Sequence, residues 1–215
     1  MPARASESFV LRTYPFGEAD LVVSFFTRDV GKLRGVAKRA RRPKSAFGAG
    51  LERLSLVRMQ YYQREGRELA NLDSCELIRS PFSLLMDYET GVALDYMAEV
   101  TDELLPQGEP NERHFRLLIA MLDYLQTQKG NPSAMWPAVL YFGLWSVRLA
   151  GILPGLTAQP DSQAIAREMF ESPIRDLSAR EWTRQTAAEL RQFLNRTIED
   201  HIEKRLRTAP VLENL

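Results

Sequence analysis

Basic side chains crowd one short stretch of the sequence, from Arg28 to Lys44. Within these seventeen residues, eight Lys and Arg residues accompany one acidic residue, Asp29, which gives a net charge of +7. Fixed cations that neutralise phosphates release condensed counterions, so such a stretch can bind a nucleic-acid backbone. A solvated edge strand that resists aggregation is the alternative interpretation. The residues predicted to contact nucleic acid are Arg28, Lys32, Arg34, Lys38, Arg39, Arg41, Arg42 and Lys44.

Aromatic side chains, which stack on bases without sequence preference, are frequent in the same part of the chain. The adjacent pairs Phe25-Phe26 and Tyr61-Tyr62 lie in expected strands. Because neighbouring strand residues point to opposite faces, one member of each pair is expected on the surface. Phe47 lies in a loop beyond the basic stretch. The residues predicted to stack on bases are Phe26, Phe47 and Tyr62.

Patterns for catalysis and metal binding are weak by comparison. The two histidines, His114 and His201, lie in helical periods, where they are expected as partly exposed helix residues and not as a base or metal ligand. Asp87 and Glu89 suit a solvated helix face, although a metal-dependent nuclease would use the same side-chain type. With Cys75 as the one cysteine, a zinc ribbon is excluded. We expect no catalytic residues, no metal and no cofactor.

The location of the protein is also expected from composition. The sequence has no run of eighteen apolar residues, and its first residues lack the apolar stretch of a secretory signal. One cysteine fits a reducing compartment. We therefore expect a cytoplasmic protein that does not act in a membrane.

The elements that must position these residues change character near Ser80. Before it, five short segments rich in β-branched and aromatic residues alternate with turns that contain Gly, Pro or Asp. Five strands in about eighty residues suit a small closed barrel of the OB type. On the third strand, Arg34 and Lys38 would share one face, and Arg39 and Arg41 the opposite face. The expected strands cover residues 8–14, 20–28, 32–41, 54–63 and 69–78.

Beyond Ser80, apolar residues recur with the 3.6-residue period of helices. Asn111 is a helix cap, and the apolar stretch from Pro132 to Gly151 predicts the central helix of a bundle. The capping-box spacing of Ser178 to Glu181 predicts a last helix through about residue 206, followed by a loosely held tail. The helices expected from these patterns cover residues 80–105, which Gly91 could divide, 111–128, 132–150, 161–171 and 178–206.

Charge divides the chain at the same place. Residues 1–80 carry a net charge of +6 and residues 81–215 a net charge of −6, which indicates two domains with different partners. The predicted fold is therefore β + α with two domains: a five-stranded OB-type nucleic-acid-binding barrel at 1–80, followed by an all-helical domain at 81–215.

Three short motifs in this order of elements resemble those of the bacterial recombination mediator RecO family. They are G-E-x-D at Gly17 to Asp20, T-x-x-x-G-K at Thr27 to Lys32, and the basic G-x-A-K-x-A-R-R stretch at Gly35 to Arg42. The resemblance is strong over residues 1–85 and weaker over the helices. It implies an OB fold followed by a helical domain. The positions that match the family's DNA-contacting stretch are Lys38, Arg39, Arg41 and Arg42.

The resemblance also implies a function in DNA repair and homologous recombination. Members bind single- and double-stranded DNA, anneal complementary strands without ATP, and cooperate with RecR in loading RecA onto strands coated by single-strand-binding protein. A cytoplasmic, nucleoid-associated location follows. Many members carry a four-cysteine zinc module, but after Leu153-Pro154-Gly155 this chain has no cysteine.

A further implication of the resemblance is a groove in the helical domain for the acidic C-terminal tail of single-strand-binding protein. Such a tail needs an apolar pocket bordered by basic residues. The cations near apolar helix faces are Arg113, Arg116, Lys129 and Arg148.

Three other functions fit the composition. An OB-type RNA-binding protein of translation would use the same cations, and faster annealing of complementary DNA would argue against it. A metal-dependent nuclease would cleave DNA when divalent metal is added. A helical interaction module with the barrel as scaffold would show no salt-dependent nucleic-acid binding.

Overall fold

The computed structural model describes residues 3–64, 66–156 and 158–215. The chain forms two compact units. The first comprises Met1–Ser83 and Leu105–Phe115, and the second comprises Leu84–Leu104 and Arg116–Leu215. One segment therefore departs from the expected boundary at residue 80, because Leu105–Phe115 belongs with the strands.

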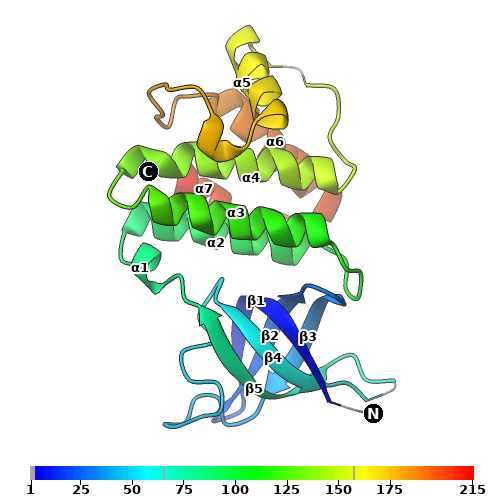
Figure 1. The fold of residues 1–215 in the computed structure, drawn as a ribbon. Coiled ribbons are helices and arrows are strands. Elements are labelled where there is room, and N and C mark those ends of the chain that lie inside the picture. The colour runs from blue at the N-terminus through cyan, green and yellow to red at the C-terminus, as the bar shows by residue number, and fades with distance from the viewer. Residues whose placement is uncertain (1–2, 65, 157) are drawn as a thin grey trace. The chain divides into compact units, whose positions relative to one another are not determined.

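The first unit is built on a closed five-stranded barrel in the order β1-β2-β3-β5-β4 (Figure 1). All neighbouring strands are antiparallel except β3 and β5, which are parallel. The predicted fold class, a five-stranded OB-type barrel followed by helices, is therefore confirmed. The strands are β1 (Arg4–Phe16), β2 (Asp20–Thr27), β3 (Gly31–Ala37), β4 (Leu56–Tyr62) and β5 (Ala70–Arg79).

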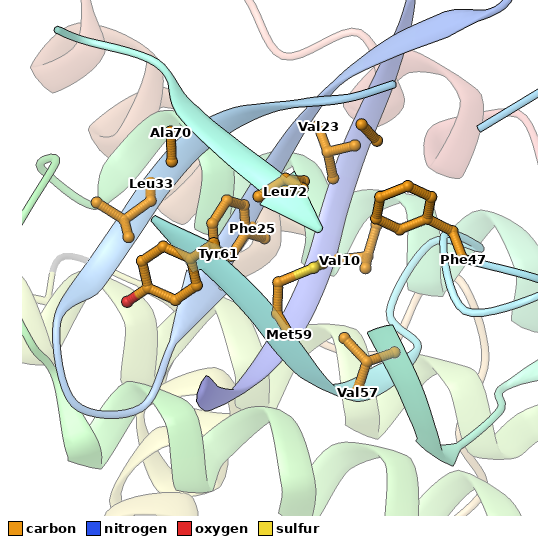
Figure 2. Close-up of a cluster of buried hydrophobic side chains, with 11 residues drawn as sticks. Val10, Val23, Phe25, Leu33, Phe47, Val57, Met59, Tyr61, Ala70 and Leu72 are labelled. Atoms are coloured by element: carbon orange, nitrogen blue, oxygen red, sulfur yellow. The ribbon is translucent and has the colours of Figure 1, made fainter. Parts of the chain in front are cut away.

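Apolar side chains from every strand fill the barrel (Figure 2). Phe25 and Tyr61 meet edge to face there, with ring centroids 5.5 Å apart. Phe47 reaches the same cluster from the loop between β3 and β4 and is 3% exposed. The prediction that Phe47 stacks on bases is therefore wrong, because its ring completes the core.

A β-bulge at Leu11 decides which side chains of β1 face outward. Val10 pairs with Phe25 and points into the core, whereas Arg12 pairs with Ser24 on the outer face. Leu11 is the extra residue between these pairs. If Leu11 were paired regularly with Ser24 instead, Arg12 would stand opposite the core residue Val23, because side chains alternate along a strand.

The segment 105–115 covers part of the outer face of the barrel. Phe115 packs against Phe9 and Phe26, with centroid distances of 4.9 and 5.6 Å. Gly31 permits this close approach, because a Cβ at its position would lie 2.2 Å from the carbonyl oxygen of Glu109. The expectation that Phe25 or Phe26 is exposed is wrong, since Phe25 points inward and Phe26 lies beneath this segment.

The second unit is helical. Its central helix is α4, which is buried on nearly every side and packs against α2, α5 and α6, as its apolar sequence predicts. No helix in the described part of the chain is long and apolar enough to cross a membrane. The helices of the chain are α1 (Phe82–Leu85), α2 (Tyr88–Leu104), α3 (Glu112–Thr127), η1 (Pro132–Ala134), α4 (Met135–Leu149), α5 (Pro160–Glu171), η2 (Ile174–Asp176), α6 (Ala188–Ile202) and α7 (Thr208–Glu213).

Two expectations about the C-terminal region are wrong. The capping-box residues do not start a helix: Glu168 accepts a hydrogen bond from the Ser178 backbone and pairs with Arg180, and α6 begins ten residues after Ser178. The last residues form α7 instead of a loose tail. Leu212 is fully buried, and the Glu99 carboxylate accepts hydrogen bonds from the first turn of α7.

Candidate nucleic-acid interface

The basic stretch leaves the sheet at Ala37, where β3 ends. The following cations therefore lie on a loop of turns, and the expectation that strand alternation divides them between two faces is wrong. The backbone enters the left-handed region at Arg39 and Lys44, with φ values of 56° and 59°. The cations of this basic loop are all exposed: Lys38, Arg39, Arg41, Arg42 and Lys44.

The turn between β1 and β2 holds the basic loop in place. The Arg39 backbone N–H donates to Asp20 Oδ1 at 2.7 Å, and the Arg41 backbone N–H donates to the carbonyl oxygen of Ala19 at 3.0 Å. Gly17 supplies the left-handed residue of this turn, with a φ of 62°. The G-E-x-D motif thus positions the basic loop although it contributes no positive charge.

Beside the basic loop, β1 presents an outward-facing row formed by the half-buried Arg12 and the exposed Tyr14 and Phe16. Tyr14 is 36% exposed and Phe16 is 52% exposed. Arg12 donates a hydrogen bond to the Tyr14 hydroxyl at 3.1 Å, and the guanidinium of Arg34 on β3 lies 5.9 Å from the Tyr14 ring centroid. Phe16 pairs with Asp20, so the row ends at the residue that holds the basic loop.

Tyr14 and Phe16, which the structure leaves exposed, were not among the residues predicted to stack on bases. The signal for them was the alternation of Arg12, Tyr14 and Phe16, which predicts one shared strand face. The expected first strand ended at Tyr14, however, and left Phe16 in a turn. Among the predicted stacking residues, Tyr62 on β4 is the one that remains partly accessible.

Two predicted contact residues already have protein partners. Arg28 pairs with Glu112 at 2.8 Å and with Glu7 at 3.0 Å, and both carboxylates raise the pKa of its guanidinium above the usual value. Lys32 is 9% exposed, and its carbonyl oxygen accepts a hydrogen bond from Gly108. The segment 105–115 therefore engages both residues, Arg28 through its side chain, which stays 44% exposed, and Lys32 through its backbone.

The cations proposed for a partner groove lie at separate positions. Arg113 and Arg116 are exposed in the first turns of α3, and Lys129 is exposed beyond its end. Arg148 lies over the rings of Trp145 and Phe170, at 5.1 and 4.4 Å from their centroids. Within residues 3–64, 66–156 and 158–215, no cluster of three or more His, Cys, Asp or Glu side chains is placed to hold a metal ion.

Comparisons with known proteins match most of the chain. The family model described as "Recombination protein O N terminal" matches residues 1–81, and the model "Recombination protein O C terminal" matches residues 85–164. A curated protein of Koribacter versatilis named "DNA repair protein RecO" is 42% identical over an alignment of 246 positions that, with gaps, covers 99% of each chain. Proteins of the same name from Anaeromyxobacter sp. (strain K) and Bifidobacterium animalis subsp. lactis are 34% and 40% identical over 69% and 67% of this chain, and the matches cover 57% and 59% of those proteins.

Proposed function

Since this chain belongs to the family of the DNA repair protein RecO and has a role in DNA repair, we propose that it binds single-stranded DNA and anneals complementary strands. The binding surface proposed is the outer face of β1, β2 and β3 together with the basic loop. The observation that supports it is the outward-facing row of Arg12, Tyr14 and Phe16 beside Arg34. Rings there offer stacking platforms for bases, and the cations offer partners for phosphates.

Annealing follows physically from such a surface. Two complementary strands repel each other through their phosphates, and a protein that neutralises phosphates lowers this repulsion. Phosphate contacts and ring stacking do not depend on base sequence, so the protein would anneal complementary strands of any sequence. The same cations would hold double-stranded DNA by its backbone. The activity proposed is binding without catalysis, and strands incubated with the protein and Mg²⁺ should stay intact.

The proposed partners follow from the family. With RecR, the protein would help load RecA onto strands coated by single-strand-binding protein, whose acidic tail would dock on the helical unit. The docking cations proposed on that unit are Arg116, Lys129 and Arg148, which are exposed, whereas the predicted Arg113 belongs to the barrel unit. These roles belong at the nucleoid in the cytoplasm.

The experiment that tests the binding face removes its two rings. Replacing Tyr14 and Phe16 together by Ala should lower the affinity for single-stranded DNA at least about fivefold per ring, because a stacked base contributes about 1–3 kcal/mol. The dependence of affinity on salt should change little, since every cation remains in place. Fluorescence anisotropy at several salt concentrations measures both quantities, and an annealing assay with complementary strands should slow in parallel.

The matched control exchanges the two rings, as Tyr14→Phe with Phe16→Tyr. It keeps two flat side chains and should bind and anneal as the unmodified protein does. Unchanged affinity in the double Ala variant would contradict the assignment of this face.

A further inference from the structure

A cavity of about 330 Å³ opens beside the outward-facing row, between β1 and the loop that joins β3 to β4. It lies where β1 has left β4: the pairing of these strands ends at Phe9 and Leu56, and the backbone of Val10 is bonded to Leu54 and Ser55. Beyond this point the edge of β1 that faced β4 is covered by the loop and is paired with no strand, while its other edge stays paired with β2. The cavity is therefore part of the barrel unit alone and is built around the bulge.

The exposed surface of this cavity is mostly polar, and apolar side chains lie at its base. Val10, Leu21 and Leu51 line it inside, where they also contact the barrel core. Thr13 and Glu52, which also line it, are exposed. A volume of about 330 Å³ is at the lower end of the range for ligand sites, so it suits one planar group with a few polar atoms.

Arg12 connects the cavity to the binding face. The residue belongs to the cavity lining, and its side chain donates to the Tyr14 hydroxyl at 3.1 Å. Arg53 adds a second cation to the lining. A strand that stacks on Tyr14 thus passes a pocket lined by two arginines, one glutamate and apolar residues.

We infer that this cavity holds one unstacked nucleotide of the bound single strand, with its base over the apolar residues Leu21 and Leu51 and its polar edge towards Glu52. The inference rests on the proposed function. Glu52 can accept a hydrogen bond from an exocyclic amino group, which cytosine, adenine and guanine carry and thymine lacks. The ligand class is therefore a strand nucleotide with an amino-bearing base, and cytosine is the smallest such base.

A photocrosslinking experiment tests the site directly. A twelve-residue deoxycytidine strand with one 5-iododeoxycytidine is irradiated in complex with the full chain, and the crosslinked peptides are identified by mass spectrometry. Crosslinks to Thr13 or Leu51 are expected. A strand of the same length made of thymidine should bind more weakly, whereas contacts to phosphates and rings alone predict no such difference.

Paired substitutions at Thr13 give the matched control. Thr13→Phe fills the cavity with a ring that strands accommodate well, and Thr13→Val keeps its volume. Thr13→Phe should abolish the crosslinks in the cavity and lower the affinity for the deoxycytidine strand about tenfold, the equivalent of one stacked base. Thr13→Val should match the unmodified protein. Circular dichroism of both variants checks that the barrel is folded.

The outcomes separate the two proposals. Crosslinks confined to Tyr14 and Phe16, with unchanged binding by Thr13→Phe, would overturn the nucleotide site and leave the proposed function standing. The nucleotide site would also be overturned if free dCMP, at the same nucleotide concentration as the strand, displaced the strand from the protein. The cavity would then bind free mononucleotides and not a nucleotide of a strand. A protein that binds no single strand at all would overturn both.

Discussion

Asp20 acts on the basic loop through one hydrogen bond and contributes no positive charge to it. Its carboxylate accepts the Arg39 backbone N–H at 2.7 Å, where the chain adopts a left-handed conformation. A residue held in that conformation carries a cost that the surroundings must offset. Thr27 plays a comparable role in the next turn, because its hydroxyl donates to the Gly31 carbonyl oxygen and accepts from Val30. Asp20 and Thr27, which belong to two of the family motifs, thus stabilise turns and need not contact DNA themselves.

Asp20→Ala provides a test in which charge and geometry predict opposite results. Removal of a negative charge alone should strengthen the binding of single-stranded DNA. Removal of the hydrogen bond should release the basic loop, and we expect affinity to fall about threefold or more, because loop ordering then opposes binding. The control is Glu18→Ala, an exposed residue of the same turn with the same change in charge, which should bind at least as tightly as the unmodified protein. Anisotropy titrations that find both variants tighter would refute the positioning role.

His114 makes the stability of the barrel unit depend on pH. Burial lowers the pKa of His114 to about 4, from 6.5. The unfolded chain therefore gains a proton as pH falls from 6.5 towards 4 while the folded chain stays neutral. Stability should be greatest above pH 6.5 and should decline by up to about 3 kcal/mol at pH 4.

Hydrogen exchange of the barrel strands across this pH range, corrected for the intrinsic rate, measures the effect. His114→Leu should remove most of the dependence of stability on pH, because the barrel unit then has no histidine to be protonated. His201→Leu, at the exposed histidine of α6, serves as the control and should keep it. The same slope in the His114 and His201 variants would show that another group is responsible.

At the scale of elements, the outer face of the barrel is divided between two uses. Towards one end, Phe9 and Phe26 lie beneath the segment 105–115, and Arg28 is paired with Glu7 and Glu112. Towards the other end, the row of Arg12, Tyr14 and Phe16 is open. The bulge at Leu11 separates the two ends and keeps the row facing outward. The basic loop adjoins the open end alone, through its bonds to the turn between β1 and β2.

The basic loop should determine the salt dependence of DNA binding. Replacing Lys38, Arg39, Arg41 and Arg42 together by Ala should reduce the slope of log affinity against log salt by roughly 0.7 for each phosphate of a single strand that is no longer neutralised. Affinity should fall alike for different sequences, because phosphate contacts carry no base information. The fold should persist, since all four side chains are exposed.

The control removes the same charge from the helical unit, at the exposed residues Arg167, Arg175, Arg196 and Arg207. Its salt slope should match that of the unmodified protein. An unchanged slope in the quadruple loop variant would mean that the basic loop is a solvated surface.

At the scale of the whole molecule, the C-terminal helix closes the helical unit through a buried charge. Arg191 is 2% exposed, donates to the Glu213 carboxylate at 3.0 Å, and lies 4.8 Å from the Trp136 ring centroid. The Glu99 carboxylate binds the Thr208 backbone and hydroxyl at the start of α7. Both ends of α7 are thus bonded to residues far away along the chain.

Glu213→Ala should lower the unfolding free energy of the helical unit by about 2 kcal/mol, because it leaves a buried guanidinium without its carboxylate. All three tryptophans, Trp136, Trp145 and Trp182, belong to this unit, so their fluorescence in urea follows its unfolding. Glu171→Ala, an exposed residue of α5, is the control and should change stability by less than about 0.5 kcal/mol. Equal midpoints for the two variants would rule out a stabilising role for the pair.

Much of the architecture could be read from local patterns. The change from period 2 to period 3.6 near Ser80, the central apolar helix and the Asn111 cap all correspond to the structure, in which Asn111 accepts the His114 backbone N–H. The C-terminal region could not be read in this way. Ser178 has the spacing of a helix cap, but its backbone N–H binds Glu168 on another element. Local preference predicts an element only where no tertiary contact competes for the same groups.

Local patterns were enough to predict a five-stranded barrel before the helices and a concentration of positive charge between Arg28 and Lys44, because alternation and charge are encoded in neighbouring residues. Which side chains of the barrel remain open could not be predicted in this way. Phe26 is buried by a segment that follows it by about eighty residues, whereas Tyr14 and Phe16 are turned outward by a bulge and left uncovered. Exposure of an outward-facing residue depends on what packs over it, and that contact is made by residues distant in the chain.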